Sequence, residues 1–130
     1  MVTGATGFIA AELVKQLLEA GYKVRGTTRN VRKAKEEAHL TNLPGVNERL
    51  EPFEADLLDN GAYDDAIVEC EYVMHTASPY VLDVEDPQRD LVDPVVKGTL
   101  SVLESAKKAD GDQAHHCHFR VRRHIGRPKR

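Results

Sequence analysis

The stretch that decides the fold is Thr3-Gly4-Ala5-Thr6-Gly7-Phe8-Ile9, close to the start of a chain of 130 residues. It lies where a β-strand should pass into a helix, because an apolar stripe at helical spacing follows it. The stripe consists of Ala10, Leu13, Val14, Leu17 and Leu18. A glycine turn at such a junction lets backbone amides approach a pyrophosphate at the helix N-terminus. Only Met1 and Val2 precede the turn, so most of the strand that should carry it is absent.

Strands and helices are predicted to alternate along the rest of the chain. The predicted helices cover residues 7–20, 33–40, 62–69 and 90–109, and the predicted strands cover 22–28, 50–55 and 72–76. This alternation predicts an α/β fold with a Rossmann-type, doubly wound parallel sheet. Right-handed crossovers give the sheet the strand order 3-2-1-4 and place the ligand crevice beyond the carboxyl ends of strands one and four. The last helix is expected to turn inward Leu91, Val95, Val102, Leu103 and Ala106.

Size and composition narrow the class of protein. A chain of 130 residues forms one domain at most. No apolar run is long enough for a membrane span, and no charged-then-apolar leader is visible. Cys70 and Cys117 are too few and too far apart for a disulfide framework, so a reducing, cytoplasmic location is expected.

Charge is distributed unevenly along the chain. Of the 18 Lys and Arg residues six follow Gln113, whereas none of the 21 Asp and Glu residues follows Asp112. The composition changes near Asp110, which divides the chain into residues 1–109 and a basic tail, 110–130. Within the tail, His115-His116-Cys117-His118 has metal-ligand residue types but poor spacing, so no metal site is assigned. Nucleic-acid binding is not assigned to the tail either, because its basic residues lack interleaved aromatics.

Two groups of residues could recognise a dinucleotide. Gly4 and Gly7 permit a tight turn and close phosphate approach; the motif is a weak signal alone, but its place in a βαβ unit strengthens it. At the end of strand two, an acid would hold a ribose 2′-hydroxyl, whereas Arg29 offers a planar donor fork to a 2′-phosphate that Lys33 could also reach. This favours NADP(H) over NAD(H); the alternative is a solvated surface arginine.

The ends of strands three and four supply further candidates. Asp56 and Leu57 follow strand three, where a carboxylate and adjacent backbone can meet an adenine edge. Capping of the next turn by Asp56 is an equally good interpretation. The segment His75-Thr76-Ala77-Ser78-Pro79 ends strand four, and its small residues would let a ribose approach. His75 itself is better explained as a packed strand histidine than as a catalyst.

The order of these motifs resembles that of the extended short-chain dehydrogenases, and most closely the branch of dihydroflavonol reductase and cinnamoyl-CoA reductase-like enzymes. The resemblance covers residues 1 to about 109. It rests on the segments Thr3–Ile9, Thr28-Arg29, Ala55-Asp56-Leu57, His75–Pro79 and Asp93-Pro94-Val95-Val96-Lys97-Gly98-Thr99. It implies hydride transfer from NADPH to a small aldehyde or ketone substrate, and a possible homodimer through the helix at 90–109.

The resemblance also implies roles for individual residues. The pyrophosphate would be held by Gly4, Ala5, Thr6, Gly7, Phe8 and Ile9. Arg29 and Lys33 would hold the 2′-phosphate, and Asp56 with Leu57 the adenine. Thr76, Ala77 and Ser78 would lie near the nicotinamide ribose.

The catalytic residues of this family have no counterpart in the sequence. Its members use a Ser and a Tyr-x-x-x-Lys pair, in which the Tyr supplies a proton and the Lys lowers its pKa. No tyrosine here has a lysine four residues on, whether Tyr22, Tyr63, Tyr72 or Tyr80. No catalytic residue is therefore assigned, and we expect little or no reductase activity from this chain alone. A non-catalytic NADP sensor and an epimerase or dehydratase of the same superfamily are the alternatives.

The tail stands where the family's fifth strand should begin. Shifting the reading frame by one base over 113–119 gives a pattern compatible with Lys-Arg-Ile-Thr-Val-Thr-Ser, which is how that strand reads in the family. The tail is therefore interpreted as frame-shifted, or else as a disordered basic segment, and in either case it is expected to pack poorly.

Overall fold

The computed structural model describes residues 1–79, 85–110 and 118–121, and its elements alternate as an α/β chain. The strands are β1 (Val2–Thr3), β2 (Val24–Thr28), β3 (Leu50–Glu54), β4 (Tyr72–His75) and β5 (His118–Val121). The α-helices are α1 (Phe8–Glu19), α2 (Val31–Ala34), α3 (Ala38–Thr41), α4 (Val46–Arg49), α5 (Asp64–Ile67) and α6 (Asp93–Asp110). A π-helical turn, η1 (Gln88–Val92), leads directly into α6.

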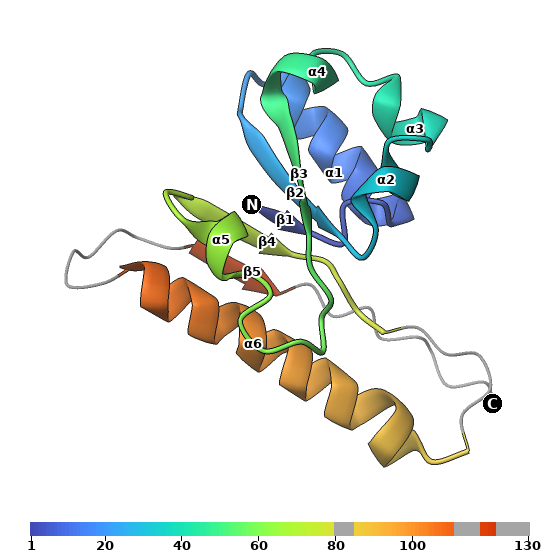
Figure 1. Ribbon diagram of the computed structural model, residues 1–130, viewed down its shortest axis with the longest axis vertical. Coiled ribbons are helices and arrows are strands. Elements are labelled where there is room, and N and C mark those ends of the chain that lie inside the picture. Colours follow the sequence, from blue (N-terminus) through green and yellow to red (C-terminus); the bar gives the residue numbers. More distant parts are fainter. Residues whose placement is uncertain (80–84, 111–117, 122–130) are drawn as a thin grey trace.

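The sheet has the strand order β3-β2-β1-β4-β5, and its strands pair in parallel (Figure 1). This confirms the Rossmann-type fold and the order 3-2-1-4. Two apolar clusters cover the two faces. One joins Val2 to buried residues of α1, including Val14 and Leu18, and the other joins Met1 to α5 and α6 through Ile67 and Val102. Met1 and Val2, which are adjacent at the start of β1, therefore face opposite layers, as expected of a doubly wound sheet.

Helix α1 follows the periodicity of its sequence closely. It begins at Phe8 after Gly7 and buries Ala10, Ala11, Val14 and Leu18. At its other end Gly21 has a φ of 88°, a left-handed conformation that favours glycine. The Gly21 amide donates to the Leu18 carbonyl at 3.0 Å and the Tyr22 amide to the Leu17 carbonyl at 3.0 Å, the paired bonds of a Schellman motif.

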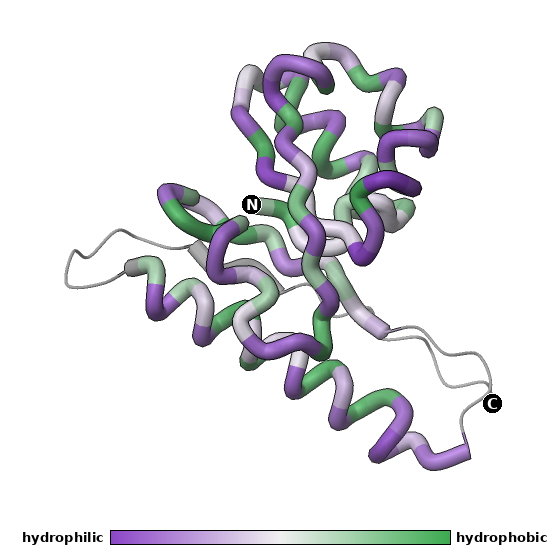
Figure 2. Tube along the Cα trace, viewed as in Figure 1, coloured by the Kyte–Doolittle hydropathy of each residue, from purple (hydrophilic) through white to green (hydrophobic). Residues whose placement is uncertain are grey.

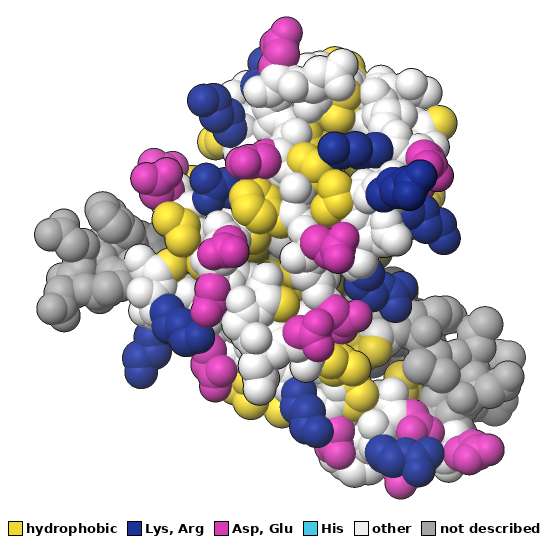
Figure 3. Space-filling model, in the orientation of Figure 1, with side chains coloured by type: hydrophobic (Ala, Val, Ile, Leu, Met, Phe, Trp, Pro, Cys, Tyr) yellow, Lys and Arg dark blue, Asp and Glu magenta, His cyan; other side chains and the backbone are white. Residues whose placement is uncertain are grey.

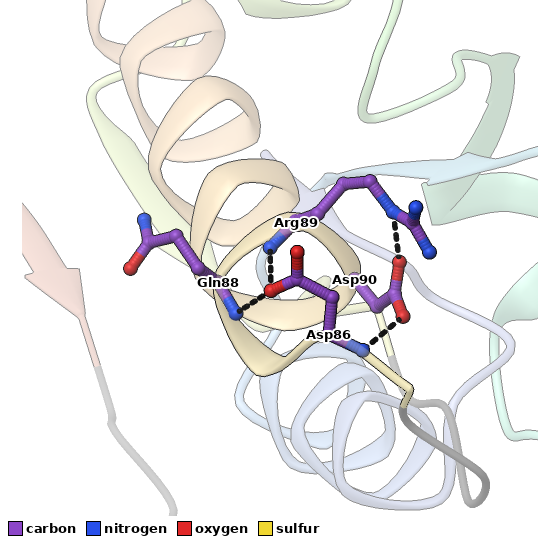
Figure 4. A network of polar contacts seen from close by, with 4 residues as sticks. All are labelled: Asp86, Gln88, Arg89 and Asp90. Atoms are coloured by element: carbon purple, nitrogen blue, oxygen red, sulfur yellow. Dashed lines mark hydrogen bonds and ion pairs between the residues drawn. The ribbon is translucent and has the colours of Figure 1, made fainter.

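The long C-terminal helix begins with a local network of polar contacts (Figure 4). The Asp86 carboxylate accepts the backbone amides of Gln88 at 3.0 Å and Arg89 at 3.3 Å. The Asp90 carboxylate accepts the Asp86 amide at 3.0 Å and pairs with the Arg89 guanidinium at 2.8 Å. Asp86 thus caps amides that have no carbonyl partner at a helix start. Pro94 lies in the first turn of α6, directly after η1.

Apolar residues recur along α6 (Figure 2), but only some of them reach the core. Val102 and Ala106 are buried as expected, and Ser101 and Ser105 are buried beside them. Val95 and Leu103 were expected to face inward, which is wrong, because each is 40% exposed. The two serines contact the α5 region instead, Ser101 at the Asp59 carbonyl and Ser105 at the Asp64 carboxylate. A stripe of larger side chains on η1 and α6 is exposed: Val92, Val95, Val96, Leu100 and Leu103.

The basic tail contributes one described element. Strand β5 pairs with β4 in the register Tyr72↔His118 to His75↔Val121. Poor packing was expected of the tail and no strand was predicted in it, whereas residues 118–121 pair along the edge of β4. The histidines and cysteine at 115–117 lie outside the described residues, and the frame-shift interpretation stays a prediction.

Two other kinds of feature are absent from the described residues. None of the helices there combines the length and the apolar character that a bilayer crossing needs. No cluster of three or more potential metal ligands occurs in that part of the chain either.

Candidate functional site

The Gly4 turn brings β1 against the end of β4. Gly4 has a φ of 64°, and a Cβ added to it would lie 3.1 Å from the Ala77 Cα. The Ala5 amide donates to the Thr27 carbonyl at 2.8 Å, and a Cβ on Gly26 would lie 2.9 Å from the Ala5 Cβ. The turn is therefore clamped between β2 and β4, and glycine is required at position 4 for both its conformation and its close approach.

The first turn of α1 faces this junction with its amides uncapped by a side chain. Gly7 occupies the N-cap position in an extended conformation, and no side chain caps the helix. Phe8 and Ile9 follow it and are exposed, at 94% and 52%. Amides at a helix start have no intrahelical acceptor, and the helix dipole adds positive potential there. This arrangement fits an anionic group such as a pyrophosphate.

A single buried hydroxyl joins the two strands that form the crevice. The Thr3 Oγ1 accepts the backbone amides of Thr76 and Ala77, each at 3.0 Å. The Thr76 hydroxyl in turn donates to the Thr3 carbonyl. Thr3 is fully buried, and its Oγ1 also lies 2.8 Å from the His75 Nδ1. Because that oxygen already accepts two amides, its own proton is directed to the His75 ring.

His75 belongs to this network as a neutral side chain. It is 5% exposed, and burial lowers its pKa. Its Nε2 lies 3.4 Å from the Thr99 hydroxyl of α6. With Nδ1 accepting from Thr3, Nε2 carries the ring proton and donates to Thr99. The contacts agree with the interpretation of His75 as a packed strand histidine.

The cationic candidates lie beyond the end of β2. Arg29 and Lys33 are both exposed, and neither forms an ion pair with another described residue. Asn30 lies between them and caps α2, since its Oδ1 accepts the Lys33 amide at 2.8 Å. This cap fixes the backbone that carries both cations while their side chains extend into solvent.

Asp56 and Leu57 follow β3 at the same edge of the sheet. The Ala55 amide donates to the Thr28 carbonyl at 2.9 Å, so the ends of β2 and β3 are adjacent. The Asp56 Oδ1 accepts the Leu58 amide at 2.9 Å, a local turn cap that matches the alternative interpretation of this residue. Leu57 packs its side chain onto Gly98 of α6. The backbone of Asp56 and Leu57 remains available for contact with an adenine.

The structure brings some of the candidates together and leaves others apart. Thr76 and Ala77 contact the glycine turn through Thr3, whereas Ser78 is exposed and contacts the carbonyl of Pro79 at 3.5 Å. Ala5 and Thr6 line a cavity of about 430 Å³ with Thr28 and α2–α4 residues, and neither Arg29 nor Lys33 lines it. A larger cavity of about 930 Å³ lies at the opposite, amino-terminal end of the strands.

Three residues contribute to the site that were not predicted from the sequence. Thr3 holds the β4 segment, Thr27 accepts the Gly4 amide on its hydroxyl at 3.3 Å, and the His39 ring contacts the Thr6 carbonyl at 3.2 Å. The two threonines carry a usable signal, because polar residues at the ends of buried strands need a partner. His39 carries none, since it reaches the turn from a helix that is 33 residues away in sequence.

The described tyrosines do not supply the missing acid. Tyr63 is buried in the core, and burial, with a smaller contribution from the Asp56 carboxylate, raises its pKa to about 12. A proton donor in carbonyl reduction needs the opposite shift. Tyr22 and Tyr72 line the larger cavity at the far end of the sheet, and Tyr80 lies outside the described residues.

A parallel sheet with a glycine turn at the start of α1 and a crevice between β1 and β4 defines a dinucleotide-binding protein of the Rossmann class. A family model, "NAD dependent epimerase/dehydratase family", matches residues 1–118. The chain belongs to this family.

Relatives place the chain near the plant reductases, which confirms the resemblance seen in the motifs. It is 50% identical over 108 residues to a cinnamoyl-CoA reductase, CAD2, of Medicago truncatula, covering 83% of this chain and 33% of the relative. It is 41% identical over 109 residues to a dihydroflavonol 4-reductase of Hordeum vulgare, covering 84% and 31%. The chain thus spans about a third of the length of these relatives.

Solved structures agree with this placement. Gre2 of Candida albicans, in complex with NADPH, is 36% identical with a TM-score of 0.73, over 85% of this chain and 33% of that one. The yeast methylglyoxal/isovaleraldehyde reductase Gre2, also with NADPH, is 35% identical with a TM-score of 0.72, over 83% and 32%.

Proposed function

We propose that the chain binds NADP(H) and forms the cofactor-binding part of an oxidoreductase. The observation that carries the proposal is the Gly4 turn, held against the end of β4 by Thr3 and presenting the uncapped start of α1. Arg29 and Lys33, without an ion-pair partner among the described residues, suit the 2′-phosphate that distinguishes NADP(H) from NAD(H).

The proposed reaction of the whole enzyme is reduction of an aldehyde or ketone. Bound NADPH would supply a hydride to the carbonyl carbon of a small-molecule substrate. The residues of this chain would hold the pyrophosphate at residues 4–9, the 2′-phosphate at Arg29 and Lys33, the adenine at Asp56 and Leu57, and the nicotinamide ribose at Thr76–Ser78. The names of the similar proteins, which describe reductases of carbonyl compounds, support this assignment.

Cofactor titration of the 130-residue chain tests the proposal. Arg29→Gln should weaken NADPH binding by roughly 10–100-fold, because it removes a charge-assisted contact of about 1.5–3 kcal/mol. NADH binding should change by less than about twofold, since NADH has no 2′-phosphate. Arg32→Gln is the matched control, because Arg32 is an exposed arginine of α2 that neither holds the proposed site nor pairs with a described residue.

Two results would count against the assignment. Equal losses for NADPH and NADH would remove Arg29 from the 2′-phosphate site. An equal loss in the Arg32→Gln control would reduce the effect to general electrostatic attraction, which rising salt should abolish.

A non-catalytic NADP-binding sensor is the second candidate, favoured by the absence of Tyr-x-x-x-Lys from the sequence. A sensor should bind NADPH with near-full affinity, whereas a part of an enzyme should bind it more weakly than the whole. In both cases we expect no NADPH oxidation with a panel of aldehydes and ketones, and measurable turnover would contradict this. An epimerase or dehydratase role is less favoured, because Arg29 and the His75–Pro79 segment match the reductases.

Assembly and location remain proposals. The exposed apolar stripe of α6 suits a homodimer. A cytoplasmic location follows from the sequence expectation of a reducing compartment.

A further inference from the structure

Helix α6 contacts the connection between β3 and α5 along one face. The connection, residues 55–63, runs down onto α6 in Figure 1. Four residues of α6 make the contacts, and their spacing by three or four positions places them on one side of the helix: Gly98, Ser101, Ser105 and Lys108. Leu57 packs on the first, the Asp59 carbonyl accepts a bond from the second at 3.3 Å, and the Asp64 carboxylate contacts the last two at 2.5 and 3.0 Å.

Gly98 is the residue that allows this close approach. It lies buried inside α6, where glycine is the least favourable residue apart from proline. Its backbone is helical and does not itself need glycine. A Cβ added to Gly98, however, would contact the Cγ of Leu57 and lie 2.6 Å from its Cδ1 and 2.7 Å from its Cδ2. Any larger residue at position 98 would therefore displace Leu57.

Leu57 lies inside a tight turn that carries the proposed adenine contacts. The Asp56 Oδ1 accepts the Leu58 amide at 2.9 Å, and the Asp56 carbonyl accepts the Asp59 amide at 3.2 Å. These bonds fix the shape of the turn. The Leu57 side chain, half-buried against the apolar cluster of α5 and α6, attaches the turn to α6. The contact between Leu57 and Gly98 therefore determines where the Asp56 carboxylate and the Leu57 amide lie.

The next residue of α6 contacts another strand of the proposed site. The Thr99 hydroxyl lies 3.4 Å from the Nε2 of His75 at the end of β4, and the His75 Nδ1 lies 2.8 Å from the Thr3 hydroxyl of β1. Two adjacent residues of α6 thus link the segment after β3 to the ends of β1 and β4. The motif Asp93–Thr99, which carries part of the family resemblance, ends with these two residues.

The charge around the turn favours a hydrogen-bond donor over an anion. Residues 54–65 contain no Lys or Arg but five acidic residues: Glu54, Asp56, Asp59, Asp64 and Asp65. Acidic side chains are spread over the middle of the face in Figure 3, where this segment lies. The exocyclic amine of adenine can donate to a carboxylate, and its N1 can accept a backbone amide. A phosphate would be repelled here and suits the cations after β2 instead.

We propose that Gly98 is a positioning residue for adenine recognition. By accommodating Leu57, it holds the Asp56 carboxylate and the Leu57 amide where the adenine edge of the dinucleotide meets them. Gly98 acts through Leu57 and not on the base itself. The inference rests on the proposed NADP(H) binding and adds the residue that sets the selectivity for adenine.

The adenine selectivity of the 130-residue chain tests the proposal. NADPH is compared with its hypoxanthine analogue, in which a carbonyl replaces the exocyclic amine and N1 carries a proton. The unmodified chain should bind NADPH roughly tenfold more tightly, because the analogue loses two hydrogen bonds. Gly98→Ala should reduce this ratio to below about threefold. Its melting temperature should fall by less than about 3 °C, since the better helix propensity of alanine offsets the displacement of Leu57.

Leu100→Ala is the matched control, because Leu100 is an exposed residue of the same helix, and it should keep the full ratio. A second measurement needs no cofactor. In the unliganded chain, the NMR resonances of residues 56–59 should shift in Gly98→Ala and stay unchanged in Leu100→Ala.

Several outcomes would overturn the proposal. A full preference for NADPH in Gly98→Ala, or unchanged resonances of residues 56–59, would remove Gly98 from adenine recognition. An equal loss of affinity for both dinucleotides, with a lower melting temperature, would leave Gly98 a structural role only. Equal binding of the two dinucleotides by the unmodified chain would overturn the adenine role while NADP(H) binding stands. If the unmodified chain binds neither, the proposed NADP(H) binding fails with it, and the resonances still show separately whether Gly98 holds the turn.

Discussion

The two ends of β1 differ sharply although the strand has only two residues. At the carboxyl end, the Thr3 side chain accepts two amides from the segment after β4, and a Cβ added to Gly4 would lie 3.1 Å from the Ala77 Cα. At the amino end, a cavity of about 930 Å³ separates β2 from β4. Local side-chain bonds thus hold the turn although the strand before it has only two residues.

This difference has a consequence for folding and for binding. A short central strand has few ladder bonds, so the site end must hold the two halves of the sheet together. Disrupting the turn should therefore cost more stability than an equivalent change at a surface turn.

The largest effect is expected from Gly4→Val. Valine would have to adopt a φ near 64° with its Cβ about 3.1 Å from the Ala77 Cα. The left-handed conformation costs about 1–2 kcal/mol and the overpacking about 1–3 kcal/mol more. Gly21→Val is the matched control, because Gly21 has a φ of 88° but no atom within 4 Å of an added Cβ. Urea unfolding should separate the two variants, and equal losses would show that the approach to Ala77 is unimportant.

Thr3→Val should have the next largest effect. Valine keeps the shape of the side chain but leaves the Thr76 and Ala77 amides without their acceptor. Because both bonds are only partly buried, the loss should be about 1–3 kcal/mol in total. Thr41→Val is the control, since that exposed hydroxyl makes one bond to the Glu37 carbonyl of its own helix. A loss in Thr3→Val no larger than that in Thr41→Val would contradict the role given to the Thr3 hydroxyl.

The sequence predicts the long helix α1 better than the short helices that follow it. Helix α1 was expected at 7–20 and spans Phe8–Glu19, because its apolar period and its flanking glycines agree. The single helix expected at 33–40 is instead α2 and α3, and α4 was not expected at all. These are one-turn helices whose ends depend on caps and on packing against β3, which periodicity over a long window cannot register.

The same limit applies to the site. The glycine turn, the strand ends and the cationic residues can be recognised in the local sequence. Their proximity follows because a parallel sheet gathers the carboxyl ends of its strands at one edge. The role of Thr3 does not, since its partners are more than 70 residues away. The outward-facing stripe of α6 was also unpredictable, because two faces of that helix carry apolar residues and only the position of the sheet decides which one is buried.

The smallest of the three effects should come from the protonation of His75. Burial lowers its pKa, so the unfolded chain binds more protons than the folded chain once the pH falls below about 6.5. The stability present above that value should therefore be lost as the pH falls toward the folded-state pKa, by at most about 1.4 kcal/mol per pH unit. Protonation would also place a second donor opposite the Thr3 hydroxyl, which already donates to Nδ1.

Melting curves between pH 7.5 and 5.5 test this sign. The His75→Asn variant should be less stable at pH 7.5 but should show a flatter pH profile than the unmodified chain, because its amide does not titrate. His39→Gln is the control, since His39 is exposed beside Glu37 at 3.3 Å. The carboxylates of Asp64 and Asp90, whose pKa values are lowered, titrate in a more acidic window. If the pH profile of stability stays steep in His75→Asn but flattens in His39→Gln, the titrating group is the surface residue His39 and not His75.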